Sequence, residues 1–341
     1  ASTLPVWVCG VVLFGSGLAT LGYEIVWFRA LHYVMGSGTY VLSTALVIFL
    51  VGLGVGGTLY RAAIRSGRGE TILGIAQLGI ALLAVLAMAG EHAMLSSFDF
   101  RSRFSAFSMT LTYAPWLQRV AVGFGVSVAI MLPATLGMGI AFPLASRFFL
   151  RSEDGISARL GFAYLLSNLG SILGAVGAAI WILPALGTVG GTRLLVGVNL
   201  ALGLLVLFRT ARGAARLAFA GFAVVVLAAS LLLPSSLGFI NSTSTGPPSS
   251  VQLLFEEESD RGTVQVYERI GEPGARSIFI DGVMVGATRD WNATVYAKQT
   301  LLAHLPMSLD RSIRTTLNLG LASSSTLYTL AGYDWVETLD V

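Results

Sequence analysis

Long apolar stretches alternate with short arginine-bearing segments over the first two thirds of the chain. A helix that crosses a membrane needs about 20 mostly apolar residues. The pattern therefore predicts seven spanning helices, at Leu4–Met35, Tyr40–Ala63, Thr71–Ala89, Trp116–Phe149, Ile156–Leu186, Thr192–Phe208 and Ala215–Leu233. The fourth stretch is overlong and contains Pro133 and Pro143, which predicts a kink or a tilt.

The pattern changes after the seventh stretch. Residues 237–250 are rich in Ser, Thr, Gly and Pro, which is typical of a linker. Beyond it, "VQLLFEE", "GTVQVYERI" and "RSIFIDG" alternate apolar and polar residues and predict short strands, with a hairpin turn at Asp281-Gly282. Asn292–Leu305 is predicted to be a helix that ends at Pro306. The fold class is thus an α-helical polytopic membrane protein (residues 1–236) with a small α/β domain (residues 251–341).

Composition supports the membrane assignment and excludes several function classes. The 341 residues are 55% hydrophobic and only 11% charged, whereas soluble domains average about 25% charged residues. A net charge of +3, scattered between helices, gives no reason to expect a nucleic-acid partner. Cys9 is the only cysteine and the three histidines are far apart, so no disulfide within the chain and no metal site is predicted.

Arginine placement predicts the orientation of the helices. Arginines follow the second predicted span, lie between the fourth and fifth, and lie between the sixth and seventh: Arg61, Arg65, Arg68, Arg147, Arg151, Arg159, Arg209, Arg212 and Arg216. These segments are cytoplasmic by the positive-inside rule. The segment after the third span also carries Glu91 and Asp99 and is assigned to the outside. The α/β domain is then extracytoplasmic, in a protein expected in a bacterial inner membrane among lipids and other membrane subunits.

Ionisable residues inside the first predicted span are Glu24, Arg29 and His32. A charged residue in a membrane helix normally faces protein and has a partner. Glu24 and Arg29 are five residues apart, about 140° around a helix, so they cannot pair well. Arg119 and Arg193, near the outer ends of two other spans, are the predicted partners of Glu24.

Two interpretations of these charges remain open. They could line a proton or substrate path, or they could form a structural ion pair that fixes helix packing. Because Glu24 is the only acid inside the predicted spans, the structural interpretation is favoured. Gly170 and Gly174 form a GxxxG pair, and Gly52–Gly57 reads "GLGVGG". These small residues predict close helix packing, within the chain or against another subunit.

Thr315–Val341, "TTLNLGLASSSTLYTLAGYDWVETLDV", has the order of a nucleotide-binding unit: apolar strand, tight turn, short helix, second strand. Turns of this kind carry several glycines, because backbone must approach the cofactor closely. Here Gly320 is the only one, followed by Ala322, Ser324 and Ser325 near the other glycine positions. The turn therefore looks like a vestigial S-adenosylmethionine-type site, and no bound cofactor is expected.

Several blocks together resemble the transmembrane spermidine-synthase-like proteins, in which a transporter-like bundle is fused to a spermidine-synthase domain. In the bundle these are Leu13–Gly57, "LPATLGMGIAFPLASRFFL" and "YLLSNLGSILGAVGAAIWILPALG"; in the domain they are "RGTVQVYER", "IFIDGVMVGATRD", "LLAHLP" and the turn. The resemblance implies a partial Rossmann-type domain. Val285 stands where spermidine synthases have a substrate-contacting glutamine. The ribose-binding acid is expected just past Val341, with the family's catalytic residues further on.

Three functional hypotheses follow. The leading one is a non-catalytic scaffold or accessory subunit of a larger membrane complex, a pseudoenzyme of spermidine-synthase-like descent with no catalytic residues in this chain. A second is a membrane-bound polyamine aminopropyltransferase that uses decarboxylated S-adenosylmethionine and whose remaining domain lies outside these residues. A third is a small-molecule transporter built on the helical bundle.

Overall fold

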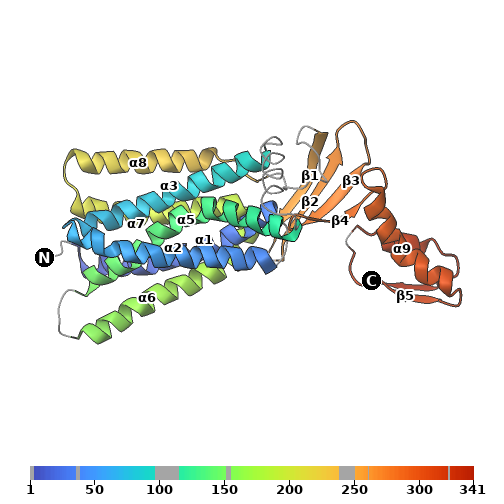
Figure 1. Ribbon diagram of the computed structural model, residues 1–341, viewed down its shortest axis with the longest axis horizontal. Helices are drawn as coiled ribbons and strands as arrows, with labels where there is room; N and C mark the ends of the chain where they lie inside the picture. The colour runs from blue at the N-terminus through green and yellow to red at the C-terminus, as the bar shows by residue number, and fades with distance from the viewer. Residues whose placement is uncertain are drawn as a thin grey trace. The chain divides into compact units, whose positions relative to one another are not determined.

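The computed structural model describes residues 4–35, 39–96, 115–150, 155–237, 250–259, 261–321 and 323–341. The chain divides into two compact units, Ala1–Phe239 and Ile240–Val341. The first unit is a bundle of long helices, and the second is a small α/β unit (Figure 1).

The helices of the first unit agree closely with the apolar stretches of the sequence. They are α1 (Val6–Met35), α2 (Thr39–Arg65), α3 (Gly69–Ser96), α5 (Pro115–Phe149), α6 (Ile156–Gly177), the π-helical segment η1 (Ala178–Ile182), α7 (Leu183–Thr210) and α8 (Ala214–Leu232). Among the described residues, six helices are long and apolar enough to cross a membrane. The chain is therefore a membrane protein by the length and composition of its helices.

The count of six differs from the predicted seven because Ile156–Thr210 forms one continuous apolar helical stretch of 55 residues. At 1.5 Å per residue this stretch would be about 80 Å long, far more than a bilayer requires. It is broken at Gly187, whose backbone angles (φ 68°, ψ −178°) are not helical. Only glycine adopts such angles without strain. The break lies four residues inside α7, so the first arm comprises α6, η1 and the start of α7, and the second arm is the rest of α7.

The two arms run in opposite directions along α1. On one side, Phe14 and Leu18 of α1 lie against Gly170 and Gly174, so α6 runs parallel to α1. On the other side, Gly15 lies against Leu202 and Gly22 against Leu195, so α7 runs antiparallel to it. The long stretch therefore crosses the bundle twice.

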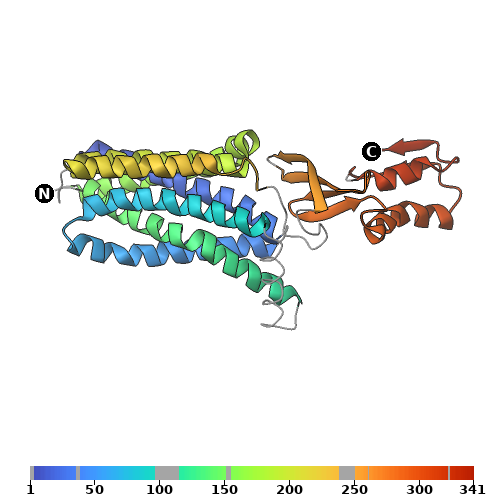
Figure 2. The ribbon, with the colours of Figure 1, turned by 90° about the horizontal axis from the view of Figure 1, so that it is seen from above.

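Glycines allow two pairs of helices to pack with their backbones in direct contact. A Cβ atom at Gly170 or Gly174 of α6 would overlap the carbonyl oxygens of Phe14 or Leu18 of α1. A Cβ atom at Gly56 of α2 would likewise overlap the Leu136 carbonyl of α5. The small residues of the GxxxG and "GLGVGG" segments thus pack inside the chain, as one of the two sequence interpretations predicted. Figure 2 shows the helices of this unit as one bundle.

The second unit begins with a four-stranded antiparallel sheet in the order β1-β2-β3-β4. Its strands are β1 (Val251–Glu258), β2 (Thr263–Arg269), β3 (Arg276–Ile280) and β4 (Val283–Ala287). The predicted strands and the Asp281-Gly282 turn are confirmed. Asp281 (φ 46°) and Gly282 (φ 76°) both have positive φ, as the two-residue turn of a tight hairpin requires.

Helix α9 (Ala293–Leu309) follows the sheet and continues past Pro306, so the prediction that it ends there is wrong. Asn292 caps it, because its side-chain oxygen accepts hydrogen bonds from the backbone N–H groups of Thr294 and Val295. Proline removes one intrahelical donor but leaves its own carbonyl available, and the N–H of Asp310 donates to that carbonyl at 3.0 Å. The last turn of the helix is retained in this way.

The end of the chain is a βαβ unit, as the order of apolar and polar residues predicted. Strand β5 (Thr315–Leu317), helix α10 (Ser325–Ala331) and β6 (Thr338–Asp340) follow one another, and β5 pairs in parallel with β6. Ala303 and Met307 of α9 form a small core with Leu330 of α10. This core joins α9 to the βαβ unit.

The glycine contacts predict which substitutions the bundle tolerates. We expect Gly174→Val to destabilise it by about 1–3 kcal/mol or more, because overpacking against rigid backbone forces α6 away from α1. Gly161→Val, on the same helix, should be nearly neutral, since no atom lies within 4 Å of a Cβ there. Chemical unfolding in detergent micelles measures both, and equal losses at the two positions would contradict the close approach.

Candidate functional site

The predicted cofactor turn links β5 to α10. Gly320 has a φ of 88°, and a Cβ atom at this position would meet nothing within 4 Å, so only its backbone angle favours glycine. Ser324 has a φ of 59°, in the left-handed region that glycine adopts more readily. Ala322 lies outside the described residues. Serine thus occupies a conformation for which glycine is the least strained residue.

Two hydroxyl groups at this turn, those of Ser323 and Thr326, are bound by Gln299 of α9. Ser323 donates to the side-chain oxygen of Gln299 at 2.7 Å and lies 3.0 Å from the Ser325 hydroxyl. Thr326 donates to the backbone carbonyl of Gln299 at 2.9 Å. The amide nitrogen of Gln299 in turn donates to the carbonyl of Val285 on β4. Gln299 of α9 is therefore hydrogen-bonded both to the turn and to the sheet.

The turn also fills space next to the sheet. A Cβ atom at Gly286 of β4 would overlap the side chain of Ser323. A cavity of about 520 Å³ remains between the turn, α9 and β5, with Asn318, Gly320 and Leu321 among its lining residues. Most of its lining is apolar, and its serine hydroxyls already have protein partners.

An acid does stand at the end of the second strand. The sequence interpretation placed the ribose-binding acid beyond Val341, but β6 ends at Asp340, twenty positions after Gly320. In dinucleotide-binding units an acid about 20 residues after the first glycine binds the ribose. The Asp340 carbonyl accepts a hydrogen bond from the N–H of Asn318, next to the turn. An acid thus follows Gly320 at this spacing within the chain, and the placement of the ribose-binding acid beyond Val341 stays a prediction.

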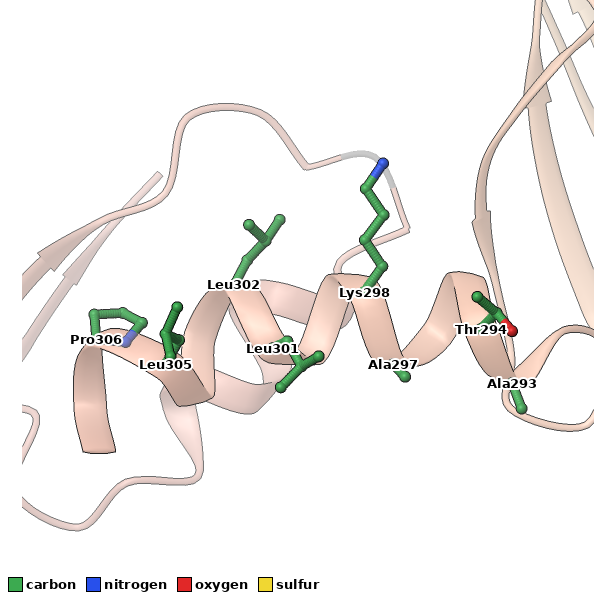
Figure 3. Close-up of a pocket in the computed structure, with 8 residues that line it drawn as sticks. All are labelled: Ala293, Thr294, Ala297, Lys298, Leu301, Leu302, Leu305 and Pro306. Carbon is green, nitrogen blue, oxygen red and sulfur yellow. The ribbon is translucent and has the colours of Figure 1, made fainter. Parts of the chain in front are cut away.

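The outward face of α9 is apolar and uncovered among the described residues. Leu301, Leu302, Leu305 and Leu309 are each more than half exposed. Three of these leucines line a groove of about 640 Å³ along the helix, together with Ala293, Thr294, Ala297, Lys298 and Pro306 (Figure 3). Because all eight residues belong to one helix, the groove is a surface feature. Exposed apolar side chains that lie together on one helix make this face a candidate contact surface.

The polar residues of α1 are not gathered into one site. Glu24 and Arg29 are partly exposed, whereas His32 is buried, with its ring 4.6 Å from that of Phe28. Among the described residues, no ion pair to Glu24 is present. Tyr23, next to it in sequence, is fully buried and accepts a hydrogen bond from Asn199 at 3.3 Å.

Arg193 does not hold Glu24, so that prediction is wrong. Its guanidinium donates to the carbonyls of Ser230 (3.0 Å), Leu233 and Pro234 (3.4 Å), at the end of α8. The last carbonyls of a helix have no intrahelical donors and carry partial negative charge, so they attract a cation strongly. The side chain of Arg119 lies outside the described residues, and its pairing with Glu24 stays a prediction.

Glu91 lies within a spanning helix, and the sequence interpretation missed it. That interpretation assigned it to an external segment, but α3 continues to Ser96. Glu91 is 1% exposed, and among the described residues neither carboxylate oxygen has a hydrogen-bond partner. It lines a cavity of about 590 Å³ between α3 and α5.

A signal for Glu91 was present in the sequence. Met88, Glu91 and Leu95 have the spacing i, i+3, i+7 of one helix face, and all three are buried. The apolar run ends at Ala89 because Glu91 interrupts it. The helical spacing of the buried residues on both sides of Glu91 nevertheless predicts a helix that continues past this acid.

Comparisons of this chain with protein-family models, with curated proteins and with solved structures found no match.

The contacts of Arg193 predict independence from Glu24. We expect Arg193→Met to lower stability by about 1–3 kcal/mol, because buried carbonyls at the end of α8 lose their donor. Adding Glu24→Gln should change this loss by no more than about 0.5 kcal/mol, as for residues that share no partner. A double-mutant cycle by chemical unfolding measures the coupling. A coupling energy above about 1 kcal/mol would contradict this prediction and indicate a direct ion pair between Glu24 and Arg193.

Proposed function

We propose that this chain is a non-catalytic membrane scaffold or accessory subunit whose α/β unit binds another protein subunit. The helical bundle provides the membrane anchor. The α/β unit provides the surface for the partner. The exposed leucines of α9 carry this proposal, because a water-facing helix with an uncovered apolar face is stabilised by burying it.

The composition of the α9 face fits a protein partner. Its leucines are spaced over several turns, as in helices that lie in an apolar groove of another protein. Lys298 is the only charged residue that lines the groove, and the center of a protein interface is similarly depleted of charge. Burying one leucine is worth about 1.5–3 kcal/mol, so a few of them suffice for a stable subunit contact.

The turn between β5 and α10 supports the non-catalytic part of the proposal. The Ser323 hydroxyl donates to Gln299 and lies 3.0 Å from the Ser325 hydroxyl, and the Ser323 side chain fills the space beside Gly286. A cofactor phosphate or sulfonium would have to break these contacts before it could approach the backbone. The spermidine-synthase-like descent, the extracytoplasmic orientation and the bacterial inner membrane belong to the same proposal and are supported by the sequence patterns alone.

The α9 surface predicts a specific loss of assembly. We expect the pair of substitutions Leu301→Asp and Leu305→Asp to weaken binding of the partner subunit about 100-fold or more, since two buried leucines are lost. The fold should persist, because both leucines are exposed in the chain alone. A photo-cross-linking residue at Leu302 in native membranes, followed by mass spectrometry, would identify the partner, and the molar mass of the purified complex would report its loss.

Tyr328→Asp is the control for this experiment. Tyr328 is exposed on α10 and does not line the groove. The control should retain the complex. If the paired leucine variant keeps the same molar mass and cross-links as the unchanged chain, α9 is not the docking surface.

A membrane-bound aminopropyltransferase is the second candidate, favoured by the position of Asp340 at the end of β6. Calorimetry with S-adenosylmethionine and its decarboxylated form on the full chain distinguishes the two functions. We expect no binding at millimolar ligand, because Ser323 is bound to Gln299 and fills the space beside Gly286. A dissociation constant in the micromolar range that is lost in Asp340→Asn would support the enzyme and overturn the non-catalytic proposal.

A further inference from the structure

We propose that the cavity between α3 and α5 is a binding site for a primary amine with an apolar body, whose ammonium group pairs with Glu91. This inference concerns the helical bundle and is independent of the partner surface on α9. It depends on the burial of Glu91, the apolar lining of the cavity and a proline in α5.

The carboxylate of Glu91 needs a partner that the described residues do not supply. It is 1% exposed, and neither oxygen accepts a hydrogen bond. Burying an unpaired carboxylate is strongly unfavourable, so buried charges in proteins are paired or neutralised. His92 is adjacent in sequence, but neighbouring positions of a helix do not face each other. A cation in the adjoining cavity would supply the missing partner.

The rest of the cavity fits an apolar body. Its volume of about 590 Å³ is within the usual range of small-molecule sites, about 300–1,000 Å³. Apart from Glu91, every lining side chain is apolar or absent: Leu83, Leu86, Ala87, Gly90, Ala93 and Met94 come from α3, and Gly125, Val126, Ala129, Ile130 and Pro133 come from α5. One acid in an otherwise apolar cavity selects a molecule with one cationic end.

Because of Pro133, the backbone carbonyl of Ala129 is a second hydrogen-bond acceptor at the cavity. Two acceptors make a primary amine the best fit. Proline has no N–H, so the carbonyl of Ala129, four residues earlier, loses its intrahelical donor. Ala129 and Pro133 both line the cavity. A primary ammonium has three N–H donors and can bind the carboxylate and a free carbonyl together. A quaternary ammonium has none and would leave both acceptors without hydrogen bonds.

Photolabelling tests this site in the intact chain. The protein is placed in nanodiscs of phosphatidylglycerol, a lipid without an amine, and exposed to a photoactivatable dodecylamine. We expect labelled peptides from α3 and α5, and competition by dodecylamine about tenfold or more stronger than by dodecanol at equal membrane content. Equal competition by the amine and the alcohol would overturn the proposal.

Two variants test separately the charge of Glu91 and the free volume of the cavity. Glu91→Gln should abolish the preference for the amine over the alcohol, whereas Glu24→Gln, an acid of α1 that does not line the cavity, should keep it. Gly125→Leu should reduce labelling about tenfold or more while Glu91 is retained, because its Cβ meets no atom within 4 Å and the side chain can enter the cavity. Gly79→Leu on α3, equally open but outside the cavity, is its control.

The outcomes also identify the source of the amine. If phosphatidylethanolamine nanodiscs suppress the labelling, the occupant is a lipid headgroup; if they do not, it is a free amphiphilic amine. A monodisperse, helical Glu91→Gln protein with an unchanged preference for the amine would overturn the role of Glu91. Failure of the α9 variants to lose a partner would leave this site unaffected, so the two proposals fail separately.

Discussion

Backbone contact between helices is the constraint on which the bundle depends. Lipid provides no hydrophobic force between helices, so they associate through close packing and a few polar contacts. Gly170 and Gly174 allow α6 to lie directly on α1, and Gly56 and Gly139 allow α2 and α5 to do the same. The break at Gly187 then returns the chain along the other side of α1. Glycine thus determines both how close the helices pack and where the longest one reverses.

The α/β unit depends on polar contacts in a comparable way. Gln299 connects the turn before α10, helix α9 and strand β4 through its side chain and backbone. These contacts hold α9 with one side packed on Leu330 and the other side uncovered. Gln299 therefore holds the turn closed and also fixes the orientation in which the leucines of α9 are exposed. The proposed function depends on these two observations, the closed turn and the exposed leucines.

Periodic sequence patterns predicted most of the helices and strands. The features that these patterns did not predict depend on single residues. The apolar stretches, the strand alternation and the Asp-Gly hairpin were sufficient to place nearly every helix and strand. Sequence could not show that Arg193 reaches the end of α8, because that contact joins positions 40 residues apart. Glu91 was missed because an acid interrupts an apolar run and was taken to mark the end of the span.

The position of Arg193 has a mechanical consequence. Helix α8 is the last helix of the membrane unit, and the chain leaves it at Leu233. Most of its large side chains are exposed, so its packing alone holds it weakly. Arg193 belongs to α7, and its guanidinium donates to carbonyls on both sides of that exit. A force applied to the chain at this exit is therefore shared with α7 through these hydrogen bonds, in addition to the packing of α8.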